Sequence, residues 1–247
     1  RLWASGYDNF RVRNIDTTSG RTEVCDHNFL GTSLYRMKQV GNEIFGLSEL
    51  GYMVALQLNG NCSPRNILDL PLTGMIFYDF LFVGADSIWL ATSNGLLKFR
   101  YDSGVLVRSA IPFSKVPNTR VNGFSKYHND SIYVATANGV YLLDAQGKIL
   151  STYNSSTSAA IRIPDCLVYH VFRTGELLWA STDKGLFKIN LNTKKATVYD
   201  QTAGLPDNNV YTTLSDPKGY LWLATNKGIC RFDPEDQSIQ NYSTAQG

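Results

Sequence analysis

The residues best suited to bind a ligand are tyrosines that stand next to charged or hydrogen-bonding side chains. Tyrosine rings stack on the C–H faces of sugars, and the polar groups beside them can pair with sugar hydroxyls. These residue types therefore indicate carbohydrate binding. The candidate site consists of Tyr35, Arg36, Tyr78, Asp79, Tyr169, His170 and Tyr211.

Each of these residues also has a structural interpretation, which the sequence leaves open. Asp79 would then pair with Arg36 or cap a loop, and His170 would be a hydrogen-bonded core histidine. The tyrosines would pack between strands.

Residues for catalysis are present but form no recognisable motif. Hydrolysis or elimination on a polysaccharide needs two carboxylates, or a histidine-based or metal-supported base, at one place. No spacing brings together two of the acidic candidates, which are Asp79, Asp130, Asp165 and Glu176. The three histidines lie at unmatched positions, and there is no Gly-rich phosphate loop. We expect no catalytic residue, no metal site and no cofactor.

Composition excludes several classes of protein. The chain has 247 residues, 43% of them hydrophobic, with a net charge of +2. It can bury a large core, and it has no strong basic field for nucleic acid. The longest apolar stretch, at residues 75–85, contains Asp79 and is too short to span a bilayer.

Four cysteines, Cys25, Cys62, Cys166 and Cys230, lie far apart with no Cys-x-x-Cys pair. Separate buried thiols are favoured over a disulfide framework, because a core of this size needs no cross-link. A Cys25–Cys62 disulfide stays open if the compartment is oxidising.

A repeat positions the candidate residues. An aromatic anchor is followed by a small residue, a threonine and a glycine, as in Trp89-Leu90-Ala91-Thr92-Ser93-Asn94-Gly95. The six anchors are Trp3, Phe45, Trp89, Tyr133, Trp179 and Trp222, separated by 42, 44, 44, 46 and 43 residues. The first two copies are weaker than the other four.

Each repeat predicts four short strands. In the last repeat they are expected at 210–215, 221–225, 229–233 and 238–242, separated by turns rich in Asp, Asn, Pro and Gly. Anchor strands such as Ile88-Trp89-Leu90-Ala91 are apolar on both faces, so each sheet needs a neighbour on both sides. Sheets of four strands that repeat at this interval are typical of a β-propeller.

The sequence therefore predicts an all-β chain forming a single β-propeller domain of about six four-stranded blades, the first lacking one strand. The expected blades are 1–27, 28–70, 71–112, 113–159, 160–203 and 204–247. We interpret the chain as cut from a longer polypeptide. The innermost strands, which carry the candidate site, are expected at 33–38, 75–82, 121–126, 167–172 and 210–215.

The last repeat resembles the two-component regulator propeller family. The likeness is carried by Gly204-Leu205-Pro206-Asp207-Asn208-Asn209-Val210, by Gly219-Tyr220-Leu221-Trp222-Leu223-Ala224-Thr225 and by Gly228-Ile229-Cys230-Arg231-Phe232-Asp233. The copies around Trp89, Tyr133 and Trp179 match its middle portion, so the resemblance covers about the last two thirds of the chain. Kelch and WD repeats would show other signatures.

The resemblance implies a function. Propellers of this family are seven-bladed, periplasmic sensor portions of bacterial hybrid two-component proteins, followed by a membrane helix, a histidine kinase and a DNA-binding module. They sense oligosaccharides and work as dimers. We expect a non-catalytic propeller in the periplasm that binds oligosaccharide, forms a homodimer, binds no nucleic acid itself and is attached to the membrane only through other parts of the parent chain.

Two alternatives remain at this stage. One is a polysaccharide-acting hydrolase or lyase, and the other is a protein-interaction scaffold.

Overall fold

The computed structural model describes residues 2–5, 11–15, 18–19, 22–26, 34–48, 52–57, 64–68, 74–102, 105–108, 119–127, 131–157 and 161–242. Their regular structure is almost entirely β-strand, and the 3-10 turn η3 spans Gln201–Ala203. The all-β class is confirmed. The chain divides into two compact units, Arg1–Pro112 and Phe113–Gly247, and each is described by itself.

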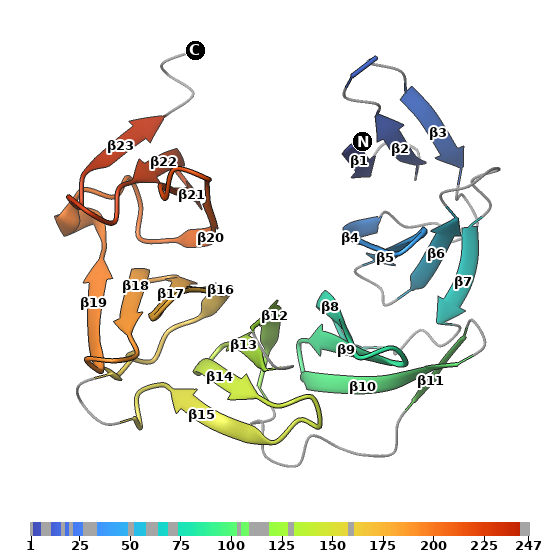
Figure 1. The fold of residues 1–247 in the computed structure, drawn as a ribbon, viewed down its shortest axis with the longest axis horizontal. Helices are drawn as coiled ribbons and strands as arrows, with labels where there is room; N and C mark the ends of the chain where they lie inside the picture. Colours follow the sequence, from blue (N-terminus) through green and yellow to red (C-terminus); the bar gives the residue numbers. More distant parts are fainter. Residues whose placement is uncertain are drawn as a thin grey trace. The chain divides into compact units, whose positions relative to one another are not determined.

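The unit Arg1–Pro112 contains three antiparallel sheets, in which strands adjacent in sequence pair with each other (Figure 1). The first is β1 Leu2–Ser5, β2 Arg11–Ile15 and β3 Thr22–Asp26. The second is β4 Leu34–Val40, β5 Glu43–Ser48, β6 Met53–Gln57 and β7 Pro64–Leu68. The third is β8 Phe77–Val83, β9 Ser87–Thr92, β10 Gly95–Asp102 and β11 Val105–Arg108.

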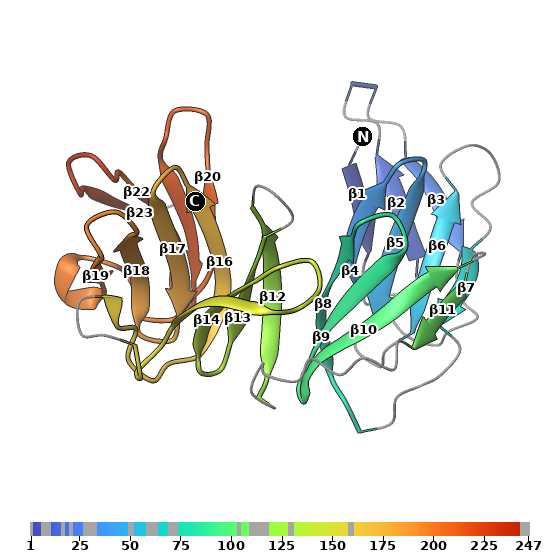
Figure 2. The ribbon, with the colours of Figure 1, turned by 60° about the horizontal axis from the view of Figure 1, so that its bottom comes forward.

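The unit Phe113–Gly247 contains three sheets of four strands each (Figure 2). They are β12 Val121–Lys126, β13 Ile132–Thr136, β14 Gly139–Leu143 and β15 Ile149–Tyr153; then β16 Val168–Thr174, β17 Leu177–Thr182, β18 Gly185–Asn190 and β19 Lys195–Tyr199; then β20 Val210–Ser215, β21 Leu221–Thr225, β22 Gly228–Phe232 and β23 Ile239–Tyr242. The first strands β12, β16 and β20 lie side by side.

The described residues form five complete four-stranded blades, which corrects the expected number of about six. The expectation assigned one blade to each aromatic anchor. An anchor lies in the second strand of its blade, as Trp89 does in β9. The anchor Trp3 lies in β1, and its sheet has only the strands β1, β2 and β3.

The threonine and glycine of the repeat build the turn between the second and third strands. The Thr182 hydroxyl donates to the Gly185 carbonyl at 2.8 Å and accepts from the Lys184 backbone N–H at 2.9 Å. Gly185 has a φ of 112°, and a Cβ there would lie 2.3 Å from the Tyr199 carbonyl oxygen. This position therefore requires glycine. The same threonine-to-glycine bond forms at Thr92, Thr136 and Thr225.

The anchors pack against the next sheet along the chain. Trp179 is 1% exposed and lies in one cluster with Val210, Leu223 and Phe232 of the following blade. Tyr133 is packed in the same way against β16 and β17, and Phe45 against β8 and β9. These contacts explain why the anchor strands are apolar on both faces.

One sheet face in the unit Phe113–Gly247 is less covered than its counterparts. Ile229 in β22 is 50% exposed, whereas Leu186, at the same register position in β18, is fully buried. Tyr242 is 38% exposed and its counterpart Tyr199 only 5%. Trp222, the anchor of this sheet, is likewise half-buried.

Cys166 and Cys230 are free and buried, as the interpretation of separate thiols predicts. Burial is the main cause that raises the pKa of Cys166 to about 12 and that of Cys230 to about 11. The side chains of Cys25 and Cys62 lie outside the described residues, so the alternative of a disulfide between them stays open.

Candidate functional site

A β-bulge near the start of each innermost strand places the candidate tyrosines. In all five complete blades the register between the first and second strands shifts at one residue. A bulge inserts an extra residue and re-aims its side chain. The residues at the shifts are Tyr35, Tyr78, Asn122, Tyr169 and Tyr211, so four of the five are tyrosines.

The structure brings Tyr169 and Tyr211 together in the unit Phe113–Gly247. Their ring centroids are 5.1 Å apart and the rings are tilted by 52°. Tyr211 is 44% exposed, so one member of the pair presents its ring to solvent. Such a pair offers an aromatic surface next to polar groups.

Two asparagines and one aspartate join the tyrosine hydroxyls into a network. Tyr169 donates to Asn209 Oδ1 at 3.5 Å, and Tyr211 donates to Asn226 Oδ1 at 2.7 Å. The Asp207 carboxylate accepts from Asn209 Nδ2 at 3.3 Å and from Asn226 Nδ2 at 3.4 Å. One carboxylate thus orients both amides that receive the tyrosine hydroxyls.

The electrostatics of the network keep Asp207 ionised. A backbone hydrogen bond from Asn209 is the main cause that lowers the pKa of Asp207. Burial raises the pKa of Tyr169, with smaller contributions in the same direction from Asp183 and Tyr211. The phenol therefore stays protonated near neutral pH and can donate a hydrogen bond.

Asn122 takes the tyrosine position in β12 and has a structural role. It is 6% exposed, donates to the Val168 carbonyl at 2.6 Å and accepts from Arg120 Nε at 2.6 Å. Its side chain therefore ties β12 to β16.

His170 lies against the neighbouring blade. Its Nδ1 accepts from the Thr213 backbone N–H at 3.5 Å, and its ring stacks on Phe172 with centroids 5.9 Å apart. These contacts agree with the structural interpretation of a hydrogen-bonded core histidine.

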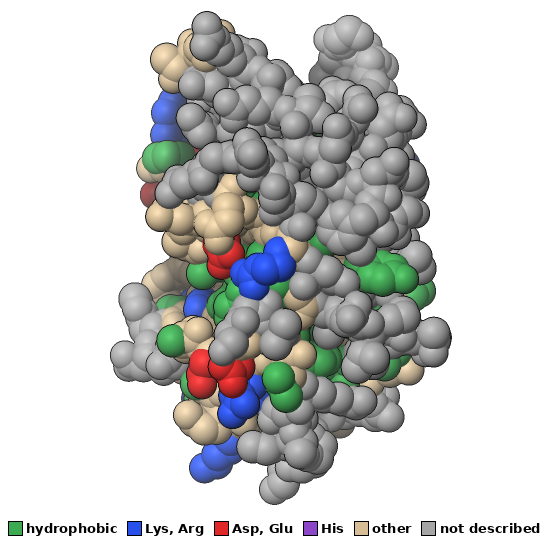
Figure 3. Space-filling model, turned by 90° about the vertical axis from the view of Figure 1, so that its right-hand side faces the viewer, with side chains coloured by type: hydrophobic (Ala, Val, Ile, Leu, Met, Phe, Trp, Pro, Cys, Tyr) green, Lys and Arg blue, Asp and Glu red, His purple; other side chains and the backbone are tan. Residues whose placement is uncertain are grey.

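In the unit Arg1–Pro112, Asp79 is 7% exposed and pairs with Lys38 at 2.7 Å. Lys38 is therefore an ion-pair partner of Asp79. Arg36 donates to the Tyr78 carbonyl at 3.0 Å. Lys38 also donates to the Phe80 carbonyl. Of Tyr35 only the backbone is described. On the face shown in Figure 3, acidic and basic side chains of described residues lie beside one another.

The candidate residues belong to two units. Tyr35, Arg36, Tyr78 and Asp79 lie in Arg1–Pro112, and Tyr169, His170 and Tyr211 lie in Phe113–Gly247. The prediction that all seven form one site stays a prediction.

Sequence reasoning missed Asp207, Asn209 and Asn226. Asp207 and Asn209 follow Pro206 just before an innermost strand, and Asn226 stands in the Thr-x-x-Gly turn. The position of Asp207 and Asn209 just before a strand could have indicated a hydrogen-bonding role, because Asp and Asn side chains often bond to nearby backbone groups.

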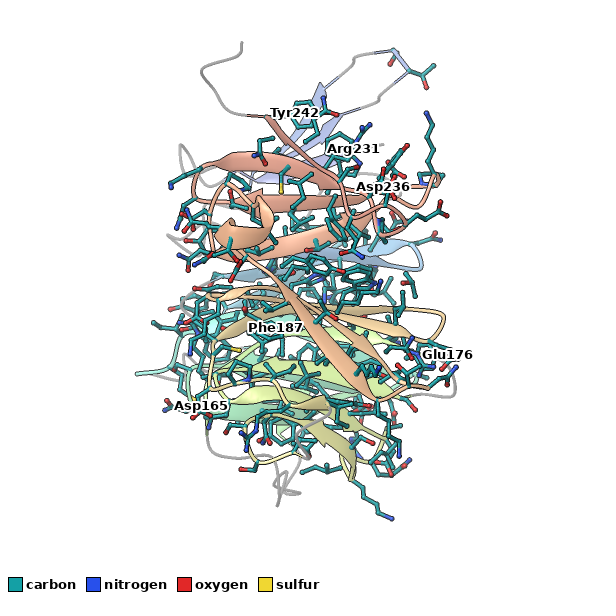
Figure 4. The ribbon with its side chains drawn as sticks, turned by 90° about the vertical axis from the view of Figure 1, so that its left-hand side faces the viewer. Asp165, Glu176, Phe187, Arg231, Asp236 and Tyr242 are labelled. Carbon is teal, nitrogen blue, oxygen red and sulfur yellow. The ribbon has the colours of Figure 1, made fainter. Side chains whose placement is uncertain are left out.

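The described carboxylates give no paired catalytic arrangement at β16. Asp165 precedes β16 and Glu176 follows it, and Figure 4 shows them on opposite sides of this unit. Within the described ranges, no group of three His, Cys, Asp or Glu side chains could hold a metal ion. No helix among the described residues is long and apolar enough to cross a membrane.

Comparison with known proteins identifies the repeat. Residues 204–227 match the family model described as Two component regulator propeller. Over 68 residues the chain is 40% identical to Histidine kinase P4 from Formosa agariphila, a match that covers 27% of this chain and 5% of that protein.

Solved structures share the fold. One is described as the extracellular domain of the hybrid two component system BT3049 from B. thetaiotaomicron; its TM-score is 0.66 at 18% identity, over 84% of this chain and 29% of that chain. Another is streptogramin B lyase, with a TM-score of 0.71 at 17% identity, over 98% of this chain and 78% of that chain. The match thus spans less than a third of the BT3049 domain and a small part of the histidine kinase. The chain is therefore a β-propeller that carries the two component regulator propeller repeat at residues 204–227, as its last repeat predicted.

Proposed function

We propose that this chain is the extracytoplasmic, ligand-sensing propeller of a hybrid two-component signalling protein and that it binds oligosaccharide. The match to the regulator propeller model, the similarity to a histidine kinase and the likeness to an extracellular domain of a two component system support this assignment. In this proposal the chain itself is non-catalytic, and a histidine kinase elsewhere in the parent protein gives the output.

The observation that carries the ligand assignment is the network of Tyr169, Tyr211 and Asp207. A half-exposed aromatic pair whose hydroxyls are held by amides suits a sugar ring, which has an apolar face and a polar edge. We propose that Tyr35 and Tyr78, which stand at the equivalent register shifts, contribute to ligand binding in their own blades. Arg36, Asp79 and His170 lie beside these tyrosines in sequence and are proposed to border the site.

Signalling would follow from unequal affinity. A ligand can shift the arrangement of a homodimer only if it binds the two arrangements with different free energies. We propose that oligosaccharide binding in the periplasm biases such a dimer, and that the bias reaches the kinase through parts of the parent protein beyond these residues.

The test is a screen of polysaccharide fragments against the purified chain by isothermal titration calorimetry, with chromatography of the sugars afterwards. Binding with intact sugars supports the sensor. Release of shorter products would instead indicate an enzyme, and no binding across the panel would favour a protein-interaction scaffold.

Variants then locate the site. Tyr169→Ala and Tyr211→Ala should each weaken oligosaccharide binding by roughly tenfold, because a stacked aromatic and its hydrogen bond are both removed. Tyr220→Ala is the matched control, because this half-buried tyrosine lies outside the network. Its ring centre is 4.4 Å from the guanidinium carbon of Arg231. Unchanged affinity in both site variants would contradict the proposed location.

A further inference from the structure

A pocket lies at the other end of β16 from Tyr169. It has a volume of about 420 Å³ and is bounded by the β12–β15 and β16–β19 sheets. Tyr169 stands near the start of β16 and Arg173 near its end. Four residues of extended chain separate positions by roughly 13 Å, so this pocket is distinct from the tyrosine network. Glu176, which lines it, is labelled in Figure 4.

Arg173 forms the charged wall of the pocket. Its side chain is 14% exposed, and the guanidinium carbon lies 3.9 Å from the centre of the Tyr127 ring. Its Nε donates to the Gly175 carbonyl at 2.7 Å. Stacking and the short backbone bond fix the guanidinium plane before any ligand arrives.

The other two guanidinium nitrogens have weaker partners. Nη1 donates to the Tyr133 hydroxyl and Nη2 to the Glu176 carboxylate, both at 3.3 Å. Charge-assisted bonds between arginine and carboxylate are normally about 2.7–2.9 Å long. The Glu176 side chain is 51% exposed, so water can solvate it if another carboxylate takes its place.

The remaining lining combines apolar side chains, such as Leu142 and Ile161, with polar ones, and it carries excess positive charge. Lys194 adds a second cation, so two cations face one carboxylate. Ser151, Thr152 and Asn192 add neutral hydroxyl and amide groups. This combination matches an anion that also carries several hydroxyls.

We propose that this pocket binds a small sugar acid such as a hexuronate. The carboxylate displaces Glu176 from Arg173 and pairs with its planar fork, while Lys194 adds long-range attraction. The sugar hydroxyls bond to Ser151, Thr152 and Asn192. The proposal does not depend on oligosaccharide binding at the tyrosine network.

A neighbouring pocket provides an internal comparison. Between the β16–β19 and β20–β23 sheets lies a pocket of about 450 Å³, built from corresponding parts of the next pair of blades. Its charged lining is Lys218, Asp233 and Glu235, which leaves one excess negative charge. Because this pocket carries excess negative charge, it should not bind a hexuronate. Binding is therefore assigned to the Arg173 pocket alone.

The experiment measures D-glucuronate binding by isothermal titration calorimetry, with D-glucose and sodium sulfate as separate probes. Glucuronate should bind, glucose should bind at least about tenfold more weakly, and sulfate should compete only weakly because it lacks the sugar hydroxyls. Equal affinity for glucose, sulfate as effective as glucuronate, or no glucuronate binding would each overturn the proposal.

Three variants test the geometry, each checked for folding by circular dichroism. Glu176→Gln removes the competing carboxylate at an exposed position and should tighten binding about two- to fivefold. Lys194→Asn should weaken it several-fold; Lys194 has a φ of 55°, which asparagine tolerates. Arg173→Gln should weaken it roughly tenfold or more. If Arg173→Gln does not fold, Glu176→Gln and Lys194→Asn still test whether glucuronate binds in this pocket.

Control variants test the assignment to this pocket. Lys218→Gln and Glu235→Gln, both in the neighbouring pocket, should leave glucuronate affinity unchanged. An effect of either one equal to that of Lys194→Asn would overturn the assignment to the Arg173 pocket.

Discussion

Tyr169 and Tyr211 belong to different blades, yet one carboxylate connects their hydroxyl groups. Asn209 accepts from Tyr169 and Asn226 accepts from Tyr211, and both amides donate to Asp207. The aromatic pair is therefore oriented by a chain of hydrogen bonds that starts at the connection before β20. The geometry of the pair depends on Asp207.

We expect Asp207→Ala to weaken oligosaccharide binding, although the Asp207 carboxylate is linked to the tyrosine hydroxyls only through Asn209 and Asn226. Loss of the carboxylate releases both amides, so the two rings are no longer held for stacking. Titration calorimetry with the best ligand of the screen measures the effect, which we expect to be about three- to tenfold. Asp236→Ala is the matched control, because its carboxylate caps the Ser238 N–H in a turn outside the network.

The same network predicts a pH dependence. The pKa of Asp207 is lowered in the folded chain, mainly by the backbone bond from Asn209. The contribution of its carboxylate to folding and binding is therefore complete above the ordinary value of about 3.9 and is lost as pH falls through the lower folded value. Asp207 stays ionised between pH 5 and pH 8, so its titration should not change the oligosaccharide affinity over this range. A loss of affinity near pH 6 would point to a different group.

The repeat made the strands predictable because its information is local. The segments expected at 210–215 and 221–225 coincide with β20 and β21, and those at 229–233 and 238–242 differ from β22 and β23 by one residue at their ends. Turn residues and apolar runs mark such ends within each copy. Among the described residues the first sheet has only the three strands β1, β2 and β3, which agrees with the expectation that the first blade lacks one strand.

The candidate site was less predictable because its contacts join separate repeats. Tyrosines on innermost strands could be selected from position, but the bulge that re-aims them leaves no signature in composition. Asp79 pairs with Lys38, which lies in the preceding blade and which the sequence did not indicate as a partner. Side-chain pairing across blades depends on register and rotamer, which the repeat pattern does not encode.

Equivalent anchors should differ in their contribution to stability. Trp179 is 1% exposed within the cluster it shares with the next blade, whereas Trp222 is half-buried and stacks on Tyr242 at 5.6 Å. Trp179→Ala should lower the free energy of unfolding by about 3–5 kcal/mol, and Trp222→Ala should cost clearly less. Urea denaturation followed by circular dichroism compares them. If both variants lose the same free energy of unfolding, Trp222 contributes more to packing than its exposed fraction indicates.

The glycine of the Thr-x-x-Gly turn should be irreplaceable for two separable reasons. Gly185→Ala combines a left-handed backbone with a Cβ placed 2.3 Å from the Tyr199 carbonyl oxygen. Gly219 has a φ of 90° and open space where a Cβ would stand, so Gly219→Ala carries only the backbone cost of about 1–2 kcal/mol. Thermal unfolding should show a larger drop in Tm for Gly185→Ala. A drop no larger than that of Gly219→Ala would exclude the steric contribution.

The buried thiols should be unreactive while the chain is folded. The pKa of Cys166 is raised to about 12 and that of Cys230 to about 11, chiefly by burial, so neither is a thiolate at pH 8. Iodoacetamide at pH 8, followed by peptide mass spectrometry, should leave both unmodified in the native chain and alkylate both in urea. Alkylation of the same peptide in urea is the control, because it shows that the thiol reacts once the chain is unfolded. Rapid alkylation of Cys230 in the native chain would show that the less covered β20–β23 sheet opens locally, because its thiol lies in the cluster that this sheet shares with Trp179.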